Sequence, residues 1–285
     1  MKYNNFRQIV LNRLEEQIEN PNPGSWRGKG TYKYIIGNPK SNSQEQIDII
    51  NKHILLPNVP KIEHDIHLHT NAHHLNSSQI MCYNFFRPMM NDFDNRKKMY
   101  KPTDKLVDLI SSLIDTPIEK TGALCAFEYI QKGKERTNFD FYFGNDNIEV
   151  FFEIKYTERY FTKSSSSKKP DVQYEKVYKD MIKNAEDIFV DGTICENDFN
   201  TKYYQLARNA IRATSSNKYA LFIYPEANEN LHNQFKEFSE KCLTKEGKKR
   251  IKLLTWESLV LHADELCIDV RDFKNRYLSF LNDER

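Results

Sequence analysis

The stretch that decides the fold is residues 136–161, which read RTNFDFYFGNDNIEVFFEIKYTERYF. Two runs rich in aromatic and β-branched residues flank the turn-forming sequence GNDN, a pattern typical of two antiparallel strands joined by a short turn. A similar run, LCAFEYI at residues 124–130, precedes them and is separated from them by the segment QKGKE. We therefore expect a three-stranded meander with strands over residues 124–130, 137–143 and 148–156.

Strands and helices alternate after this meander. The patterning predicts helices over residues 171–189, 202–213, 228–242 and 257–265, and strands over residues 219–224 and 251–255. Before about residue 100 the pattern is helical or irregular, with helices expected over residues 8–18 and 43–56. This order predicts an α/β (α+β) fold in which helices flank a mixed β-sheet. It also predicts a mostly helical accessory region, residues 1–100, before a core of residues 101–285.

The composition excludes several classes of protein. The 285 residues are 39% hydrophobic and 13% aromatic, which suffices for a large core. No apolar run approaches the roughly 18 residues of a membrane span, and the chain becomes acidic before the apolar run of a signal peptide develops. The five cysteines are widely spaced and never form a C-x-x-C pair, so they predict reduced thiols. We expect a cytoplasmic protein with no membrane partner.

Polar residues interrupt the apolar alternation of the expected meander. Because side chains two residues apart share a face of a strand, Glu153 and Lys155 project side by side. In the preceding strand Asp140 alternates with three phenylalanines, residues 139, 141 and 143, and so points away from their face. With GNDN as the turn, Asp140 falls opposite the Phe151 region and one diagonal step from Glu153. The three side chains are therefore predicted to converge, with Glu128 of the first strand as a fourth member.

Such a set suits phosphodiester hydrolysis. Two carboxylates hold Mg²⁺ through oxygen and leave coordination positions for water and phosphate, while the metal acidifies the water and neutralises developing charge. A neighbouring lysine can orient or deprotonate that water. The alternative is an ordinary cross-strand ion pair on a solvent-facing sheet, and spacing alone does not decide between the two.

Three ordered motifs resemble those of a known family. The run from Glu153 to Phe161 reads E-I-K-Y-T-E-R-Y-F, the segment SSQIMCYNFF spans residues 77–86, and YYQLARNAIRA spans residues 203–213. Together they resemble the PD-(D/E)XK nuclease superfamily, and within it a family of bacterial restriction endonucleases with an E-x-K-Y-T-E-x-x-F signature. One departure is Phe139, which stands before Asp140 where the superfamily name expects proline.

The resemblance implies a restriction-endonuclease-like fold and a set of roles. Asp140 and Glu153 would bind the metal, Lys155 would be the catalytic lysine, and Glu128 and Gln205 would be supporting residues. The implied cofactor is Mg²⁺, with Mn²⁺ as a substitute, and the implied substrate is double-stranded DNA, gripped in part by the accessory region. A type II restriction role would require a homodimer for palindromic cutting and makes a cognate methyltransferase a candidate partner.

Basic residues near the expected site are candidate phosphate contacts. They lie beside the strand ends, in the segment KSSSSKK of residues 163–169, and in the glycine-rich loop GSWRGKG of residues 24–30: Arg136, Arg159, Lys163, Lys168, Lys169, Arg27 and Lys29. Ordinary surface charge is the competing interpretation.

The segment HDIHLHTNAHH, residues 64–74, offers a different kind of site. Its start resembles the D-x-H-x-H-[ST] motif of the polymerase-and-histidinol-phosphatase type of metal phosphoesterase, although that family needs further histidines and none lies between His74 and His232. A single structural Zn²⁺ on some of these histidines and Cys82 is a second interpretation, with the candidate ligands His64, His67, His69 and His73. A polar segment leading into a helix capped by Ser77 or Ser78 is the third. A catalytically inactive DNA-binding module on the nuclease fold remains an alternative to the enzyme.

Overall fold

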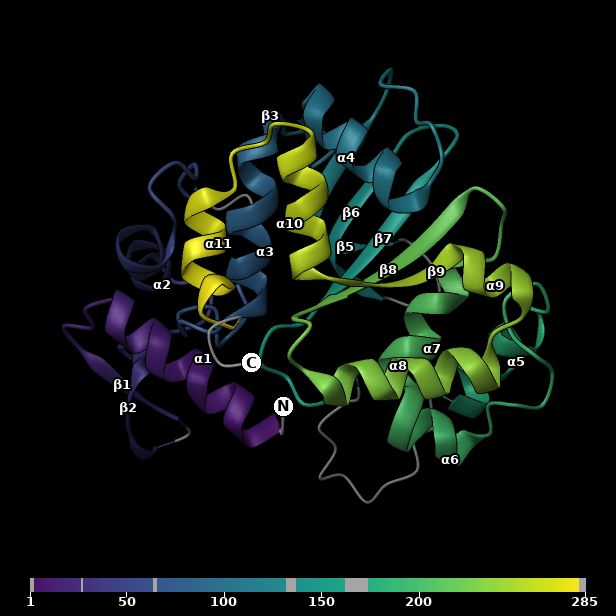
Figure 1. Cartoon of the computed structure of the whole chain (residues 1–285), viewed down its shortest axis with the longest axis horizontal. Helices are drawn as coiled ribbons and strands as arrows, with labels where there is room; N and C mark the ends of the chain where they lie inside the picture. Colours follow the sequence, from purple (N-terminus) through teal and green to yellow (C-terminus); the bar gives the residue numbers. More distant parts are fainter. Residues whose placement is uncertain (1–2, 27, 64–65, 132–136, 162–173, 282–285) are drawn as a thin grey trace.

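The computed structural model of the chain describes residues 3–26, 28–63, 66–131, 137–161 and 174–281. At the centre of these residues is a seven-stranded mixed sheet in the order β3-β4-β5-β6-β7-β8-β9 (Figure 1). Strands β3 to β7 pair antiparallel, and β7, β8 and β9 pair parallel. The strands are β3 Met90–Asp94, β4 Met99–Pro102, β5 Leu124–Ile130, β6 Asn138–Gly144, β7 Glu149–Ile154, β8 Lys218–Tyr224 and β9 Ile251–Thr255. The predicted mixed sheet flanked by helices is confirmed.

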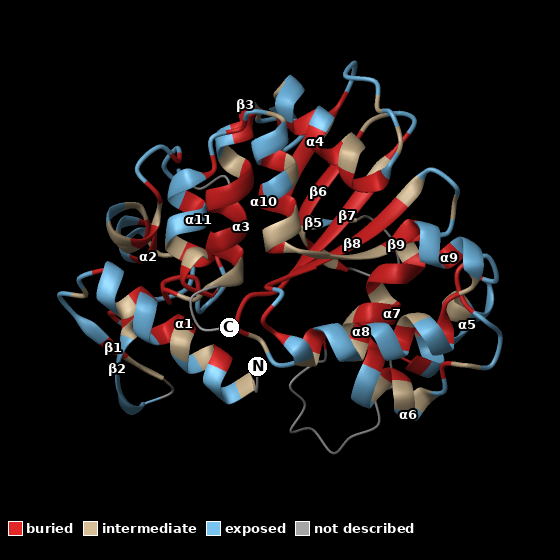
Figure 2. Cartoon of the chain, viewed as in Figure 1, coloured by how far each residue is buried: buried red, intermediate tan, exposed pale blue. Residues whose placement is uncertain are grey.

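The central strands form because their residues suit burial on both faces. Strand β8, KYALFIY, is buried at every position after Lys218, as expected of a strand with parallel neighbours on both sides. Strand β7 is buried from Val150 to Ile154. The apolar runs that predicted these strands are therefore the innermost part of the molecule, shown in red along the sheet in Figure 2.

Helices cover both faces of the sheet and create two main cores. One core joins Phe141, Phe152 and Ile154 of the sheet to the helices α1 Tyr3–Gln17, α3 Ser78–Phe86, α4 Asp104–Ile114, α10 Trp256–Glu265 and α11 Arg271–Tyr277. The other joins Phe222 of β8 to the helices α7 Tyr204–Ala210 and α8 Glu229–Cys242, together with the π-helical turns Tyr174–Tyr178 and Phe199–Tyr203. The shorter helices are α2 Gln44–Ile49, continued by a π-helical turn Ile50–Ile54, α5 Lys179–Lys183, α6 Glu196–Asp198 and α9 Lys245–Arg250.

The first ninety residues contain a feature that the sequence did not predict. Strands β1 Pro23–Trp26 and β2 Lys29–Ile36 pair antiparallel as a two-stranded hairpin beside α1 (Figure 1). Residues 90–102 supply β3 and β4 of the large sheet, to either side of the expected boundary at residue 100. The division into an accessory region and a core stays a prediction.

The helix expected over residues 171–189 is shorter in the structure. Residues 171–173 lie outside the described part of the chain, and helical structure runs from Tyr174 to Lys183. The chain leaves the helix at Asn184, after which Phe189 forms an isolated bridge with Leu243. The remaining apolar residues, Ala185, Ile188 and Phe189, fill the second core from a turn rather than from a helix.

Candidate active site

Asp140 lies where the pairing of β6 with β7 stops. The ladder runs from the Gly144–Glu149 pair to the Phe141–Phe152 pair, and at the next residue the carboxylate of Asp140 replaces the main chain. Its Oδ2 accepts a hydrogen bond from the N–H of Ile154 at 2.6 Å. Asp140 was expected opposite the Phe151 region, and the register is displaced from that expectation because the chain reverses over Asn145–Ile148 and Tyr142 is the residue that pairs with Phe151. Asp140 therefore lies beside Glu153 and Ile154.

The side-chain alternation breaks at the same level on β5 and β6. Glu128 has a backbone φ of +49°, in the left-handed region that non-glycine residues rarely adopt. Phe141 stacks on Phe86 of α3 with ring centroids 4.2 Å apart, whereas Phe139 packs against Phe151 on the other face at 4.6 Å. The prediction that three phenylalanines of β6 share one face is therefore wrong for Phe139. Strain of this kind costs on the order of 1 kcal/mol and concentrates at functional sites.

The carboxyl group of Glu128 is buried next to this break. Its Oε2 accepts a hydrogen bond from the Nδ2 of Asn138, and its Oε1 has no hydrogen-bond partner within the described residues. Burial raises the pKa of Glu128 to about 7, against the opposing effect of the Asn138 hydrogen bond. Burial, followed by the nearby charge of Glu153, likewise raises the pKa of Asp140 well above its ordinary value. The two carboxyl groups thus share a desolvated, acidic environment.

Glu153 is the hydrogen-bonding centre of the cluster and is only 4% exposed. Its Oε1 accepts hydrogen bonds from the Nζ of Lys155 at 2.6 Å and from the Nε2 of Gln205 at 2.8 Å. Its Oε2 accepts one from the Nδ2 of Asn209 at 2.6 Å. Sequence reasoning missed Asn209, although it lies four residues after Gln205 and so on the same face of α7.

Lys155 is fixed by both its side chain and its main chain. Its N–H donates to the carbonyl of Ile223 at 2.8 Å, and its carbonyl accepts from the Nε1 of Trp256 at 3.2 Å. Burial alone would lower the pKa of Lys155, but the negative charges of Glu153, Glu158 and Asp140 outweigh it and raise the pKa. The ammonium group is therefore held as a charged hydrogen-bond donor beside the carboxylates.

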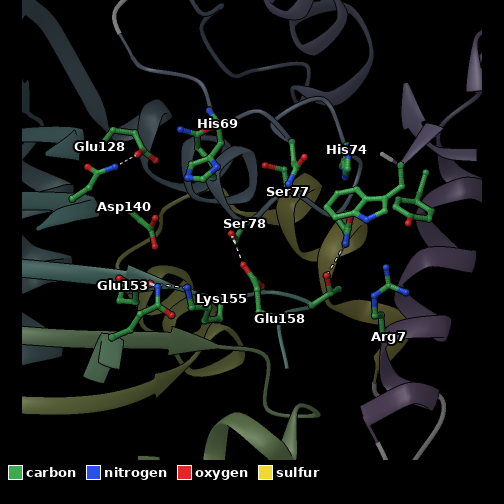
Figure 3. Close-up of a pocket in the computed structure, with 18 of the residues that line it drawn as sticks. Arg7, His69, His74, Ser77, Ser78, Glu128, Asp140, Glu153, Lys155 and Glu158 are labelled. Atoms are coloured by element: carbon green, nitrogen blue, oxygen red, sulfur yellow. Dashed lines mark hydrogen bonds and ion pairs between the residues drawn. The ribbon is translucent and has the colours of Figure 1, made fainter. Parts of the chain in front are cut away.

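These side chains line one open cavity of about 740 Å³. In Figure 3, Glu128 and Asp140 lie on one side of it, and His74 and Arg7 lie on the opposite side. Its described lining contains four carboxylates but only three Lys or Arg cations: Glu128, Asp140, Glu153 and Glu158 against Arg7, Lys155 and Arg208. A cation bound beside Glu128 and Asp140 would favour their ionised forms, which burial disfavours.

Glu158 connects the strand end to the N-terminal part of the chain. Its Oε1 accepts from the Oγ of Ser78 at 2.8 Å, and its Oε2 accepts from the N–H of Tyr156 at 2.7 Å. Ser77 is the N-cap of α3 and accepts a hydrogen bond from the N–H of Ile80, which confirms the predicted helix start. The beginning of α3 is thus held against the turn that follows Lys155.

The donor set fits Mg²⁺. Among the described residues, no group of three or more His, Cys, Asp or Glu side chains is arranged to hold a metal ion. Mg²⁺ requires fewer protein ligands, because it keeps several waters and commonly binds through one or two carboxylates together with substrate phosphate. Asp140 and Glu153 supply such a pair at the wall of an open cavity. Carboxylate oxygens suit Mn²⁺ equally well.

Comparison with known proteins assigns the family. A family model described as restriction endonuclease associating with ARP (REase-ARP) matches residues 15–283. The chain belongs to the REase-ARP family. Membership implies a nuclease acting on DNA. The chain matches none of the curated proteins and none of the solved structures.

Two arginines that the sequence did not single out line the cavity beside Lys155. Of the predicted phosphate contacts, Arg159 and Lys29 are described and exposed, but neither is among the residues that line the cavity. The others lie outside the described residues: Arg27, Arg136, Lys163, Lys168 and Lys169. Arg7 of α1 and Arg208 of α7 line the cavity instead. Arg208 lies three residues after Gln205, so the face of α7 that positions Gln205 also brings Arg208 to the cavity.

The histidines of residues 64–74 differ in their surroundings, although the rings of His73 and His74 lie 4.8 Å apart and His74 lines the cavity. His69 lines the cavity, His67 lies 3.3 Å from the Nδ2 of Asn42, and His73 lies 3.4 Å from the Nε2 of Gln46. His64 lies outside the described part of the chain, as does Asp65. The Sγ of Cys82 faces the main-chain carbonyl of Asp140 at 3.8 Å. Among the described residues, none of these histidines belongs to a group of three or more His, Cys, Asp or Glu side chains that could hold a metal ion, and a histidine metal site stays a prediction.

No helix within the described residues has both the length and the apolar character that crossing a bilayer demands.

Proposed function

We propose that this chain is a metal-dependent DNA endonuclease of the PD-(D/E)XK type with a type II restriction role. One observation carries the proposal: Asp140, Glu153 and Lys155 lie together at the ends of β6 and β7, in an open cavity. An ordinary cross-strand ion pair does not require the β-pairing to stop at Asp140, as it does here. The exposed ion pair that spacing alone allowed is also disfavoured, because Glu153 and Lys155 are 4% and 7% exposed.

Each side chain has a role in this proposal. Asp140 and Glu153 would hold Mg²⁺, which would acidify the attacking water and neutralise charge on the phosphate. Lys155 would donate a hydrogen bond to that water or to a phosphate oxygen from an ammonium already oriented by Glu153. Gln205 and Asn209 position Glu153 by donating to its two oxygens. Glu128 supports the site from β5.

The wider roles follow from family membership and substrate symmetry. We infer double-stranded DNA as the substrate and the cytoplasm as the place of action. Cutting both strands of a palindromic site calls for a two-fold homodimer, and a cognate methyltransferase would protect host DNA. The family description adds an association with a partner abbreviated ARP.

Plasmid cleavage tests the proposal. Purified protein is incubated with unmethylated plasmid in Mg²⁺, in Mn²⁺ and in a chelator. We expect cutting in either metal, none in the chelator, and none by the variants Asp140→Asn, Glu153→Gln and Lys155→Ala. The matched control is Glu149→Gln on the same strand β7, because Glu149 pairs with Lys218 at 2.5 Å and is not part of the described cavity lining. Normal cutting by any of the three site variants would remove the proposal.

A parallel binding measurement separates the alternatives. An inactive DNA-binding module would shift DNA without cutting it in any metal. A histidine-based phosphoesterase would retain zinc or manganese on purification and stay active as Lys155→Ala. Each of these outcomes contradicts the assignment of Asp140, Glu153 and Lys155.

A further inference from the structure

The β1–β2 hairpin supplies the cavity wall opposite Glu128 and Asp140. Trp26, Tyr32 and Tyr34 from this hairpin line the same cavity as Asp140 and Glu153. Tyr32 is 37% exposed, and β2 is exposed from Lys29 to Lys33. Trp26 and Tyr34 are half-buried beside it. Aromatic side chains that line a cavity, with one of them exposed, indicate a binding surface.

The rings form a continuous wall. Tyr32 and Tyr34 lie 5.4 Å apart between ring centroids, Tyr34 and His74 lie 6.0 Å apart, and His74 and Trp26 lie 5.4 Å apart. The guanidinium of Arg7 lies over the Tyr34 ring at 5.7 Å. We call Trp26, Tyr32, Tyr34 and His74 the aromatic wall. It combines ring faces with a cation, the combination that proteins use to bind single-stranded nucleic acid.

The aromatic wall is held in a fixed relation to the acids. The N–H of Leu75 donates to the carbonyl of Tyr34 at 2.9 Å, and the N–H of Ile36 donates to the carbonyl of His73 at 3.4 Å. The chain that carries these two hydrogen bonds leads directly into α3, whose Ser78 donates to Glu158 beside Lys155. The hairpin is therefore connected to the strand end that carries Lys155 by two backbone hydrogen bonds and by the side-chain hydrogen bond from Ser78 to Glu158.

The chemistry of the aromatic wall selects its ligand. In an intact duplex each base is stacked on its neighbours, so its face is not available to a protein ring. An unpaired or extruded base presents that face, and the cost of extrusion is a few kcal/mol. Cations on the same lining, Arg7 and Arg208, suit the phosphates that flank such a base.

We infer that the aromatic wall stacks an unpaired DNA base of the strand whose phosphodiester lies at the Asp140–Glu153 pair. The inference rests on the proposed nuclease function and adds to it a preference for unpaired bases next to the cut. Tyr32 is the residue that contributes the most exposed ring to this contact.

Fluorescent DNA tests the inference. Lys155→Ala protein in Mg²⁺, which is expected to bind without cutting, is titrated into a duplex with a single-stranded extension that carries 2-aminopurine. A fully paired duplex of the same length is the reference DNA. We expect quenching of the 2-aminopurine by stacking, and tighter binding of the extended DNA than of the paired duplex. Adding Tyr32→Ala should remove the quenching and weaken binding of the extended DNA about 5- to 100-fold.

Two matched variants separate the ring from the hairpin. Tyr32→Phe keeps the ring and should preserve both signals. Lys33→Ala removes a charge from the neighbouring position of β2, which does not line the described cavity. It should change the affinity for the extended DNA and the affinity for the paired duplex by equal factors. Unchanged quenching with Tyr32→Ala, or equal weakening for both DNAs, overturns the inference. If the wild-type protein cuts plasmid but Tyr32→Ala fails this test, the stacking inference is wrong and the nuclease proposal stands. If the quenching is seen but the wild-type protein cuts no plasmid, the nuclease proposal is wrong and base stacking on the aromatic wall stands.

Discussion

Replacing Asn209 by leucine should damage the site more than the same replacement of Gln205. Both residues donate to Glu153 from α7, but they donate to different oxygens. Gln205 shares Oε1 with the ammonium of Lys155, so its loss leaves that oxygen with a donor. Asn209 is the donor to Oε2, and its side chain is in a residue only 1% exposed. Leucine resembles both amides in size and cannot donate.

The expected loss of unfolding free energy depends on whether each Glu153 oxygen keeps a hydrogen-bond donor. A hydrogen bond to a charged group contributes about 1.5–3 kcal/mol, and a buried acceptor left without a partner loses that full amount. We expect Asn209→Leu to lower the free energy of unfolding by about 2–3 kcal/mol and Gln205→Leu by about 1 kcal/mol. At about 2 °C per kcal/mol for a chain of this size, the melting temperature should fall by about 4–6 °C and about 2 °C.

Denaturant unfolding followed by circular dichroism measures the two differences, and plasmid cleavage measures the effect on Glu153. Asn209→Leu should also slow cleavage more than Gln205→Leu, because Glu153 then rotates more freely. Asn209→Asp is a sharper version, since it places a second carboxylate against Oε2. Equal effects of the two leucine variants, or a larger effect of Gln205→Leu, would show that Asn209 does not orient Glu153.

Three further predictions concern the metal, the pH and an ion pair between the buried Arg250 and the exposed Asp187. Mg²⁺ at 100 times its dissociation constant should stabilise the wild-type chain by about 2.7 kcal/mol, and this gain should vanish in Asp140→Asn when melting is compared with and without the metal. Burial lowers the pKa of His73 to about 4, below its ordinary 6.5. The unfolded chain therefore takes up the proton first as the pH falls from about 6.5 to 4, and unfolding free energies measured against pH should drop by on the order of 2 kcal/mol in wild type relative to His73→Asn. Arg250 is 6% exposed and pairs with Asp187 at 2.6 Å, so Arg250→Met should cost about 2–3 kcal/mol in denaturant unfolding, while Asp187→Asn should cost under about 1 kcal/mol.

The part of the fold that could be predicted is the buried sheet, whose strands are apolar runs in the sequence. Strands β5 to β9 consist of aromatic and aliphatic runs bounded by turn residues, and each was predicted to within about two residues of its observed bounds. The β1–β2 hairpin escaped prediction because β2 is exposed over most of its length and so lacks an apolar alternation. Helix α4 was not predicted, although Thr103 caps its start and six buried apolar residues line one face.

The sequence predicted which residues lie together at the candidate site, but not the backbone geometry that places them there. Asp140, Glu153, Lys155, Glu128 and Gln205 all line one cavity, because alternation on β7 fixes which side Glu153 and Lys155 face. The left-handed backbone of Glu128 and the carboxylate that replaces a ladder hydrogen bond at Asp140 are local exceptions to strand geometry. Strand periodicity has no means of indicating either exception. Their roles in catalysis stay predictions until cleavage is measured.

The contact between Trp256 and the main-chain carbonyl of Lys155 has a consequence for synthesis. These two residues are separated by about a hundred positions, which a ribosome translates in roughly 5–20 s. Throughout that interval the strand end that carries the lysine lacks its indole partner, and β8 and β9, needed to complete the sheet beside it, are still being made. A growing chain therefore contains Asp140, Glu153 and Lys155 long before the rest of the sheet and the Trp256 contact are there to fix the strand end that carries them.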